Sequence, residues 1–327
     1  MSGTKLVYGL LVVGLVGSMA SGAGFSWKDT EGKYLDMLYD GQRVTRYMYD
    51  HDESSEQRIF ETYKVLHHVF DETGQKLLTN GPDGVTPYTK DILYPHHRGI
   101  FIGWNKLQFE GQPYDTWHMT KGVRQIHQAF LGKKAGIDSA SATSLIHWIT
   151  GEGKVMVAEE RTVTLHRPNK NRIVLVDFET KLKAVNGEVV LGGDPEHAGF
   201  QYRAHDDVAK GPAEGKAKYL FHKEDINPKK DKDLPWVAIT YGLNGKQYSV
   251  LYMSHPTNPT ADAVYSAYRD YGRFGEFLTH TIPAGETFTL KYQIWVAQGP
   301  LPQRNVLNDL YEAYTKEAKV ETNRTRR

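Results

Sequence analysis

The chain is made of short apolar or alternating runs separated by turn-forming residues, and this pattern restricts the fold more than any other feature. Segments 155–165 and 173–182 alternate between apolar and polar residues with a period of two, which is the period of a strand with one buried face. Similar runs recur along the chain at short spacing. Only segment 302–316 has helical spacing, with Val306 and Leu310 four residues apart. The pattern predicts an all-β fold, a large antiparallel β-sandwich with one C-terminal helix.

The domain organisation follows from length and local composition. We expect one β-sandwich domain over residues 24–318, because all-β domains often exceed 200 residues and 327 residues require no second domain. The charged segment 319–327 is predicted to be a disordered tail. Segment 208–235 is rich in Lys, Asp, Gly and Pro and is predicted to form long exposed loops. The pair Asn186-Gly187 predicts a two-residue hairpin turn.

Residues 1–23 have the three parts of a secretory signal peptide. Lys5 supplies the positive charge, residues 6–16 are apolar, and small residues around position 20 offer a cleavage site. An uncleaved anchor is the alternative, but the apolar run is shorter than the ~20 residues that a membrane-spanning helix needs. The chain has no cysteine, so lipoprotein attachment and thiolate chemistry are excluded. We therefore predict a soluble periplasmic or secreted bacterial protein that does not contact the membrane after signal cleavage.

Charge and motif content exclude several partners. The chain has 40 basic and 39 acidic residues, which gives no electrostatic reason to expect binding to nucleic acid or an anionic membrane. It contains no serine-nucleophile elbow, phosphate loop or dinucleotide fingerprint. The expected partner is a carbohydrate or another small-molecule substrate.

Histidines stand beside other polar residues in four segments. The first is YPHHRGIFIGWN (94–105), in which a polar triplet precedes an apolar strand that ends in Trp and Asn. The second is YDTWHM (114–119), the third is HAGFQYRAH (197–205), and the fourth runs from HPTNP (255–259) to YRDYGRF (268–274). In the third segment, strand alternation places Gln201 and Arg203 on one polar face. Each segment also has a structural interpretation as a turn, a solvated strand face or a loop packed by its own aromatic residues.

This ordered set of motifs, closing with AGETFTLKYQIWVAQG (284–299), resembles the PmoA-like family of exported bacterial proteins over residues 63–299. The resemblance implies a supersandwich of the galactose-mutarotase type and an association with glycan degradation. It identifies no catalytic residues, and the family name gives no basis for expecting oxygenase activity. Many relatives carry an acidic residue before the paired histidines, where this chain has Leu93-Tyr94-Pro95.

The leading hypothesis is an enzyme that acts on a sugar or a uronate-containing glycan by isomerisation, epimerisation or elimination. Hydrolysis ranks lower, because no convincing pair of carboxylates is evident. Imidazole and phenol groups would act as acid and base. The candidate catalytic residues are His96, His97, His118 and Tyr271. The candidate substrate-binding residues are Arg98, Trp104, Asn105, Trp117, His197, Gln201, Arg203, His255, Asn258 and Arg269, with Trp104 or Trp117 stacking on the sugar ring.

Two other functions stay open. A non-catalytic glycan-binding protein would need the same polar and aromatic surface without a titrating pair. The leading hypothesis requires no cofactor, whereas the third hypothesis is a single Cu or Zn ion held by His96, His97 and His118, with His197 or His255 as further ligands.

Overall fold

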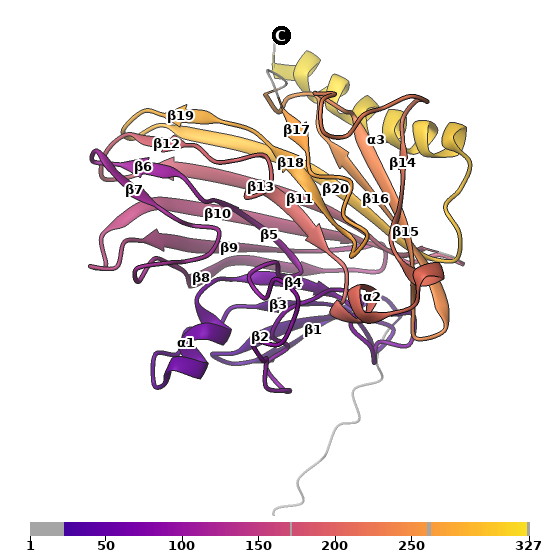
Figure 1. The fold of residues 1–327 in the computed structure, drawn as a ribbon, viewed down its shortest axis with the longest axis horizontal. Coiled ribbons are helices and arrows are strands. Elements are labelled where there is room, and N and C mark those ends of the chain that lie inside the picture. The colour runs from indigo at the N-terminus through magenta and orange to yellow at the C-terminus, as the bar shows by residue number, and fades with distance from the viewer. Residues whose placement is uncertain (1–22, 171, 260–262, 326–327) are drawn as a thin grey trace, which may run out of the picture.

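A computed structural model describes residues 23–170, 172–259 and 263–325, and in these ranges two large antiparallel sheets pack face to face (Figure 1). The prediction of an all-β sandwich with a C-terminal helix is confirmed. The predicted signal peptide lies outside the described residues, apart from its last position. No helix in the described ranges combines the length and the apolar composition that crossing a bilayer requires.

The first sheet has the order β1-β2-β3-β4-β5-β13-β18-β17. Its strands are β1 (Phe25–Thr30), β2 (Tyr34–Tyr39), β3 (Gln42–Met48), β4 (Leu66–Val69), β5 (Ile100–Trp104), β13 (Ala198–Arg203), β17 (Val264–Tyr265) and β18 (Arg273–Phe277). Segments far apart in sequence therefore meet at its centre.

The second large sheet has the order β14-β15-β16-β20-β11-β10-β9-β8, and a smaller sheet has the order β19-β12-β6-β7. The large sheet comprises β8 (Arg124–Ala135), β9 (Ser139–Ile149), β10 (Val155–His166), β11 (Arg172–Ala184), β14 (Lys218–Phe221), β15 (Trp236–Leu243), β16 (Lys246–Ser254) and β20 (Thr287–Gln298). The small sheet comprises β6 (Leu107–Phe109), β7 (Gln112–Tyr114), β12 (Val189–Leu191) and β19 (His280–Ile282). The helices are α1 (Glu56–Thr62), α2 (Asp206–Lys210), the short 3₁₀ helix η1 (Ala213–Gly215) and α3 (Arg304–Thr325).

The main core fills the space between the two large sheets. Alternate residues of β5 and β13 point into it, and they meet residues of the second sheet there. Phe200 on β13 stacks on Tyr292 on β20 with ring centroids 4.5 Å apart, and Trp104 contacts Trp148 at 6.0 Å. The strand alternation read from the sequence is therefore the alternation that builds this core.

Helix α3 covers the outer face of the second sheet at β15, β16 and β20 (Figure 1). Leu307 is fully buried there, and the indole Nε1 of Trp236 donates to Asn308 Oδ1 at 2.9 Å. The helix begins at Arg304 and continues to Thr325, beyond the predicted end at position 316 and into the predicted disordered tail. The Glu, Ala and Lys residues after position 316 favour helix, which explains the extension.

Two local predictions were wrong. Strand β12, which follows Asn186-Gly187, pairs with β6 and β19 instead of forming a hairpin with β11. Burial of Val189 and Leu191 in the core outweighs the local turn preference. Segment 208–235 also contains regular structure, because η1, β14 and most of α2 fall within it.

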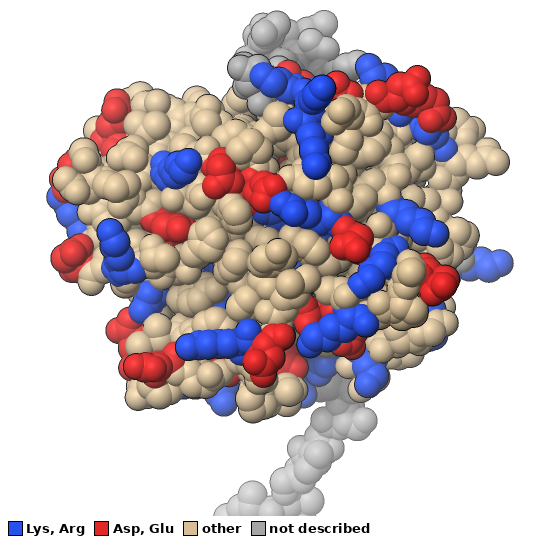
Figure 2. Space-filling model, in the orientation of Figure 1, with Lys and Arg blue, Asp and Glu red and all other residues tan. Residues whose placement is uncertain are grey.

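The outer face of the first sheet carries the residues that alternate with the core. Gln201 pairs in register with Phe101 on β5 and with Gly275 on β18, and Arg203 pairs with Arg273. Paired residues of antiparallel strands point to the same face, so these side chains share one surface. On the face shown in Figure 2, Lys and Arg are interspersed with Asp and Glu, consistent with the balanced composition.

Candidate metal centre

Four histidines come together over the outer face of the first sheet, and we call His96, His97, His118 and His197 the histidine cluster. The ring centroids of His96 and His118 are 4.4 Å apart, and those of His118 and His197 are 4.9 Å apart. His97 lies beside His96 at 4.3 Å. The cluster thus unites three segments that are separated by about 20 and 80 residues in sequence.

Three members of the cluster have the geometry of metal ligands. One ring nitrogen from each of His96, His118 and His197 lies within 4.8 Å of the corresponding nitrogen of the other two. Zinc bound tetrahedrally at 2.0–2.1 Å would bring such nitrogens to roughly 3.3 Å from one another. Small inward movements of the rings would therefore be needed to enclose an ion.

His118 and His197 are held by two turns of the same sequence form, Asp-x-x-His. In each turn the aspartate accepts a bond from the histidine Nδ1 at 2.8 Å, in the pairs Asp115–His118 and Asp194–His197. Each aspartate also accepts the backbone N–H two residues later at 2.9 Å. With Nδ1 engaged, the free nitrogen of both rings is Nε2. A carboxylate behind a histidine is the usual support of a metal ligand, because it orients the ring and increases its basicity.

The end of strand β5 positions both turns. Trp104 donates its backbone N–H to Thr116 Oγ1 at 3.0 Å, and Thr116 N donates to the Trp104 carbonyl at 2.8 Å. Gly103 makes this approach possible, because a Cβ there would lie 2.3 Å from the Thr116 carbonyl oxygen. Asn105 donates to Asp194 Oδ2 at 2.6 Å and so fixes the second turn.

Buried Lys64 connects the loop that carries His96 to the first turn. Its ammonium donates to the carbonyl of His96 at 2.9 Å and to the carbonyl of Trp117 at 2.5 Å. Burial holds the pKa of Lys64 well below its ordinary value. Through its two hydrogen bonds, Lys64 holds the loop that carries His96 next to the turn that carries Trp117 and His118.

The surroundings favour neutral imidazoles, which is the form that binds metals. Burial lowers the pKa of His96 to about 2, with a further contribution from the neighbouring His118 and Lys64. Burial, followed by the charge of Arg273, also holds the pKa of His97 well below its usual range. For Asp115 and Asp194, burial raises the pKa but the hydrogen bonds outweigh it, so both carboxyls have a lowered pKa. The aspartates thus remain acceptors for the histidine N–H groups.

Several buried polar atoms in and beside the cluster have no hydrogen-bond partner among the residues that the structure describes. They are Nε2 of His96, both ring nitrogens of His97 and Nε1 of Trp117, which borders the cluster. The Trp117 ring lies 6.0 Å from His97 and 5.9 Å from His197. Buried polar groups are normally satisfied, so this group of free atoms indicates a place where a ligand supplies the missing contacts.

The structure brings many of the residues predicted from sequence into one place. His96, His97, His118, His197 and Trp117 form the cluster and its border. Tyr271 lies beside it, with its ring stacked near His97 at 6.3 Å. Gln201 and Arg203 lie on the sheet face beneath, and Asn105 supports Asp194.

Other predicted residues have structural roles instead. Trp104 is fully buried in the core and donates to the Leu278 carbonyl, which corrects the prediction that it stacks on a sugar. Arg98 is fully buried and donates to backbone carbonyls, including that of Glu61 at 3.0 Å. Asn258 bonds to the backbone of Lys291.

His255 lies apart from the cluster, whereas Arg269 lies at its rim. The ring of His255 contacts Tyr314 of α3, at a centroid distance of 5.2 Å. Arg269 forms an ion pair with Glu196. The predicted metal set named His97, whereas the structure groups His197 with His96 and His118.

Sequence reasoning missed Lys64 and Asp194. The signal for Asp194 was available, because DTWH (115–118) and DPEH (194–197) repeat the same Asp-x-x-His spacing. No sequence signal indicates Lys64, since its role depends on two carbonyls that are 32 and 53 residues away.

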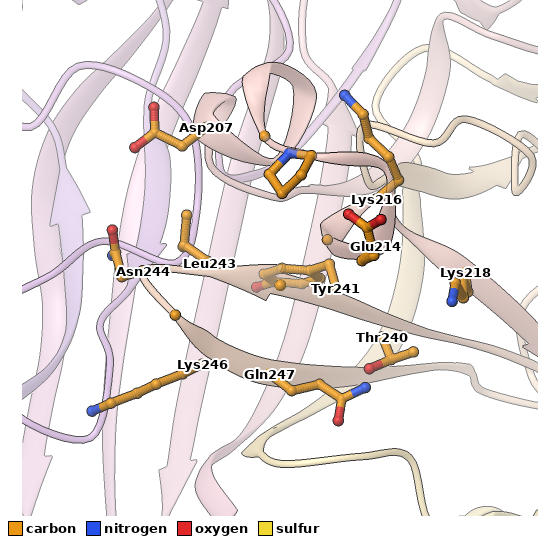
Figure 3. A pocket seen from close by; sticks show the side chains of 15 residues that line it. Asp207, Glu214, Lys216, Lys218, Thr240, Tyr241, Leu243, Asn244, Lys246 and Gln247 are labelled. Carbon is orange, nitrogen blue, oxygen red and sulfur yellow. The ribbon is translucent and has the colours of Figure 1, made fainter.

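Two pockets in the described ranges differ from the histidine cluster in their chemistry. One of about 550 Å³ lies between α2 and the turn joining β15 to β16, and Figure 3 shows Lys216, Glu214, Lys246 and Gln247 among its lining side chains. It contains no histidine and mixes both charges. Another pocket of about 460 Å³ is lined in part by Asn105 and Asp115, so it reaches the residues that support the cluster.

The comparisons with known proteins identify a family but no activity. A family model described as a family of unknown function, DUF6807, matches residues 34–312. The matching model carries no PmoA-like name. No curated protein matches the chain.

Solved structures with a similar arrangement are remote. A heparan sulfate lyase HepC mutant from Pedobacter heparinus is 11% identical with a TM-score of 0.43, and the match covers 85% of this chain and 37% of that one. A kojibiose phosphorylase, named as putative, from the human microbiome is 8% identical with a TM-score of 0.35, covering 87% and 30%. An α-galactosidase from Lactobacillus brevis is 8% identical with a TM-score of 0.33, covering 84% and 38%. The chain thus spans about a third of the length of each of these structures.

Proposed function

This chain belongs to DUF6807, a family of unknown function, and we propose that it is a metal-dependent enzyme. His96, His118 and His197 would each supply one imidazole nitrogen to a single divalent transition metal, with zinc or copper as the preferred ions. Three protein ligands leave at least one position open for water or substrate, which is the arrangement of catalytic sites and not of structural ones.

The observation that carries the proposal is the pair of Asp-x-x-His turns. Two separate segments each hold a histidine by Nδ1 on a carboxylate at 2.8 Å, and both histidines lie with one ring nitrogen within 4.8 Å of a ring nitrogen of His96. The free, buried Nε2 of His96 completes the set.

The surroundings of the paired histidines disfavour a general-acid role for them. A catalytic acid must carry a proton near neutral pH, whereas burial and adjacent positive groups keep both His96 and His97 neutral. A bound metal would instead polarise a substrate oxygen or lower the pKa of a bound water. His97, with both ring nitrogens free, would accept or donate a hydrogen bond beside that water.

We propose a carbohydrate as the substrate. Vicinal hydroxyls of a sugar can occupy open positions on a metal as oxygen ligands, and the ring of Tyr271 borders the site near His97. Tyr271 also provides a phenol that could take part in proton transfer.

Elemental analysis of protein purified without chelator or an affinity tag containing histidine tests the metal assignment. We expect about one equivalent of Zn or Cu per chain, and loss of that metal in the His118→Ala/His197→Ala variant. A matched His147→Ala/His166→Ala variant, altered on β9 and β10, should keep the metal. Absence of metal from the wild type after incubation with each ion, or full retention in the first variant, would contradict the proposal.

A screen of neutral and uronate-containing oligosaccharides tests the enzymatic assignment. Product formation should require added metal and should disappear with the His118→Ala/His197→Ala variant. Binding of a glycan at equal affinity by wild type and variant, without turnover by either, would support the non-catalytic alternative.

A further inference from the structure

A buried arginine beside the histidine cluster has no counter-ion. Arg273 on β18 is 2% exposed, and its guanidinium lies over the Trp117 ring, with Cζ 5.3 Å from the ring centroid. Its hydrogen bond through Nη1 is to the neutral hydroxyl of Ser266, at 2.5 Å, and its buried Nε has no partner. Among the described residues, no carboxylate forms an ion pair with it. A buried, unpaired charge is costly, so a missing anion is the simplest explanation.

The nearest acidic group is already engaged. Glu196 affects Arg273 electrostatically, but its carboxylate is bonded to Arg269 and to the Tyr268 hydroxyl. That ion pair lies at a half-exposed position, where solvent also screens it. Glu196 therefore leaves Arg273 without a direct partner.

Other cations near the cluster also lack acidic partners. Lys64 and Arg98 are buried, and both donate to backbone carbonyls. Arg203 is the exception, because Asp206 accepts from its Nη2 at 3.2 Å. The two aspartates of the cluster are occupied by His118 and His197. Neither of these aspartates is therefore free to pair directly with Arg273.

Gln201 adds a neutral group to the same surface. It is 1% exposed, and neither its amide oxygen nor its amide nitrogen has a hydrogen-bond partner in the part of the chain that the structure describes. Gln201 is the diagonal neighbour of Arg273, since Arg203 pairs with Arg273 and Gln201 with Gly275. Diagonal neighbours on one face lie about 7–8 Å apart at their Cα atoms, which long side chains can span.

We infer that the ligand of this site carries a carboxylate, which Arg273 binds as an ion pair and Gln201 binds through its amide. This inference rests on the proposed function, because it places the carboxylate beside the metal centre. Arginine suits the task, since its guanidinium can donate two parallel hydrogen bonds to a carboxylate. Combined with a carbohydrate substrate, the inference selects sugar acids over neutral sugars.

Calorimetric titration with D-glucuronate and D-glucose tests the inference on both metal-loaded and metal-free protein. We expect D-glucuronate to bind at least tenfold more tightly than D-glucose, with an affinity that weakens as salt rises. Acetate should compete with D-glucuronate, because it offers the carboxylate alone. Equal affinity for the two sugars, or no effect of acetate, would overturn the inference.

Two variants locate the effect. Arg273→Gln should weaken D-glucuronate binding by at least tenfold and leave D-glucose binding unchanged. Gln201→Glu should also abolish the preference for D-glucuronate over D-glucose, because the new carboxylate would pair with Arg273. This second variant tests the inference if Arg273→Gln does not fold. The control Arg304→Gln removes the same charge on α3, where Arg304 pairs with Glu224, and should change the affinity by less than twofold. Retained preference for D-glucuronate in Gln201→Glu would contradict the assignment.

Metal analysis of the same samples separates this inference from the proposed function. Carboxylate preference without bound metal would uphold the anion site and reject the metal centre. Bound metal without a preference for D-glucuronate would uphold the metal centre and reject the anion site.

Discussion

Two groups of buried polar side chains in this protein differ in how completely they are satisfied. In the core between the sheets, Glu159 accepts from Arg161 at 2.8 and 3.0 Å, from Trp148 at 2.8 Å and from Thr180 at 2.8 Å. Its carboxylate is saturated, and the charge of Arg161 balances it. We call these four residues the Glu159 cluster; one nitrogen in it, Arg161 Nη1, remains unpartnered.

The histidine cluster on the outer face has the opposite character. Within the described ranges, its buried nitrogens are largely free and the adjacent Arg273 has no counter-ion. Both groups contain residues that are rarely buried without a reason. The contrast shows that burial of polar residues alone does not mark a site; a group of neighbouring atoms without partners is the stronger indication.

The largest expected effect comes from breaking the Glu159 cluster. Glu159→Ala should lower the free energy of unfolding by about 3–5 kcal/mol, because it leaves the buried charge of Arg161 uncompensated. Chemical denaturation measures the change. The double variant Glu159→Leu/Arg161→Met should be less destabilised than Glu159→Ala, since it removes both charges. Metal content of the folded protein should not change in either variant.

A second core carboxylate is expected to make stability depend on pH. Glu276 accepts from Ser254 at 2.9 Å and from Tyr265 at 3.2 Å, yet burial raises its pKa from 4.5 to about 7. Between pH 4.5 and pH 7 the folded state keeps a proton that the unfolded state releases. Its contribution to the free energy of unfolding is therefore greatest below pH 4.5 and falls by roughly 3 kcal/mol as pH rises through about 7.

Denaturation at several pH values checks this prediction against Glu276→Gln. The variant should lack that part of the pH dependence and should be relatively more stable at pH 8 than at pH 5, compared with the wild type. Identical pH profiles of the two proteins would show that Glu276 does not titrate in this range.

Metal binding should stabilise the folded protein through the histidine cluster and not through the Glu159 cluster. Free metal at 100 times its dissociation constant should raise the free energy of unfolding of the wild type by about 2.7 kcal/mol. The His118→Ala/His197→Ala variant should lose this increment, which thermal unfolding with and without Zn²⁺ detects. Without metal its stability should lie close to that of the wild type, because both side chains are partly exposed, at 29% and 25%.

The smallest effects are expected at the supporting aspartates. Asp115→Asn and Asp194→Asn should each weaken metal affinity by about 10–100-fold, because the amide cannot orient the ring as a carboxylate does. Competition with a chromogenic chelator measures the affinity. Asp177→Asn is a matched control, since Asp177 bonds to His166 at 2.5 Å outside the histidine cluster. An equal loss in all three variants would show that the effect is not specific to the cluster.

Much of the fold was predictable because strand alternation is local. Segments 155–165 and 173–182 alternate as they do because each strand buries one face, and they form paired strands β10 and β11. The hairpin predicted at Asn186-Gly187 does not form, because the partners of β12 are the distant strands β6 and β19, with which Val189 and Leu191 are buried. Local turn chemistry carries no information on that choice.

The sequence by itself determined the β-sandwich, its C-terminal helix and the residue types from which a site could be built. Only the tertiary structure decided which of those residues meet. The sequence does not distinguish Trp104 from Trp117 as a site residue. In the structure, β5 directs Trp104 into the core between the sheets, whereas Trp117 is buried beside the histidines. His96, His118 and His197 converge because β5 pairs with β13, and a pairing between segments about 100 residues apart leaves no local trace in the chain.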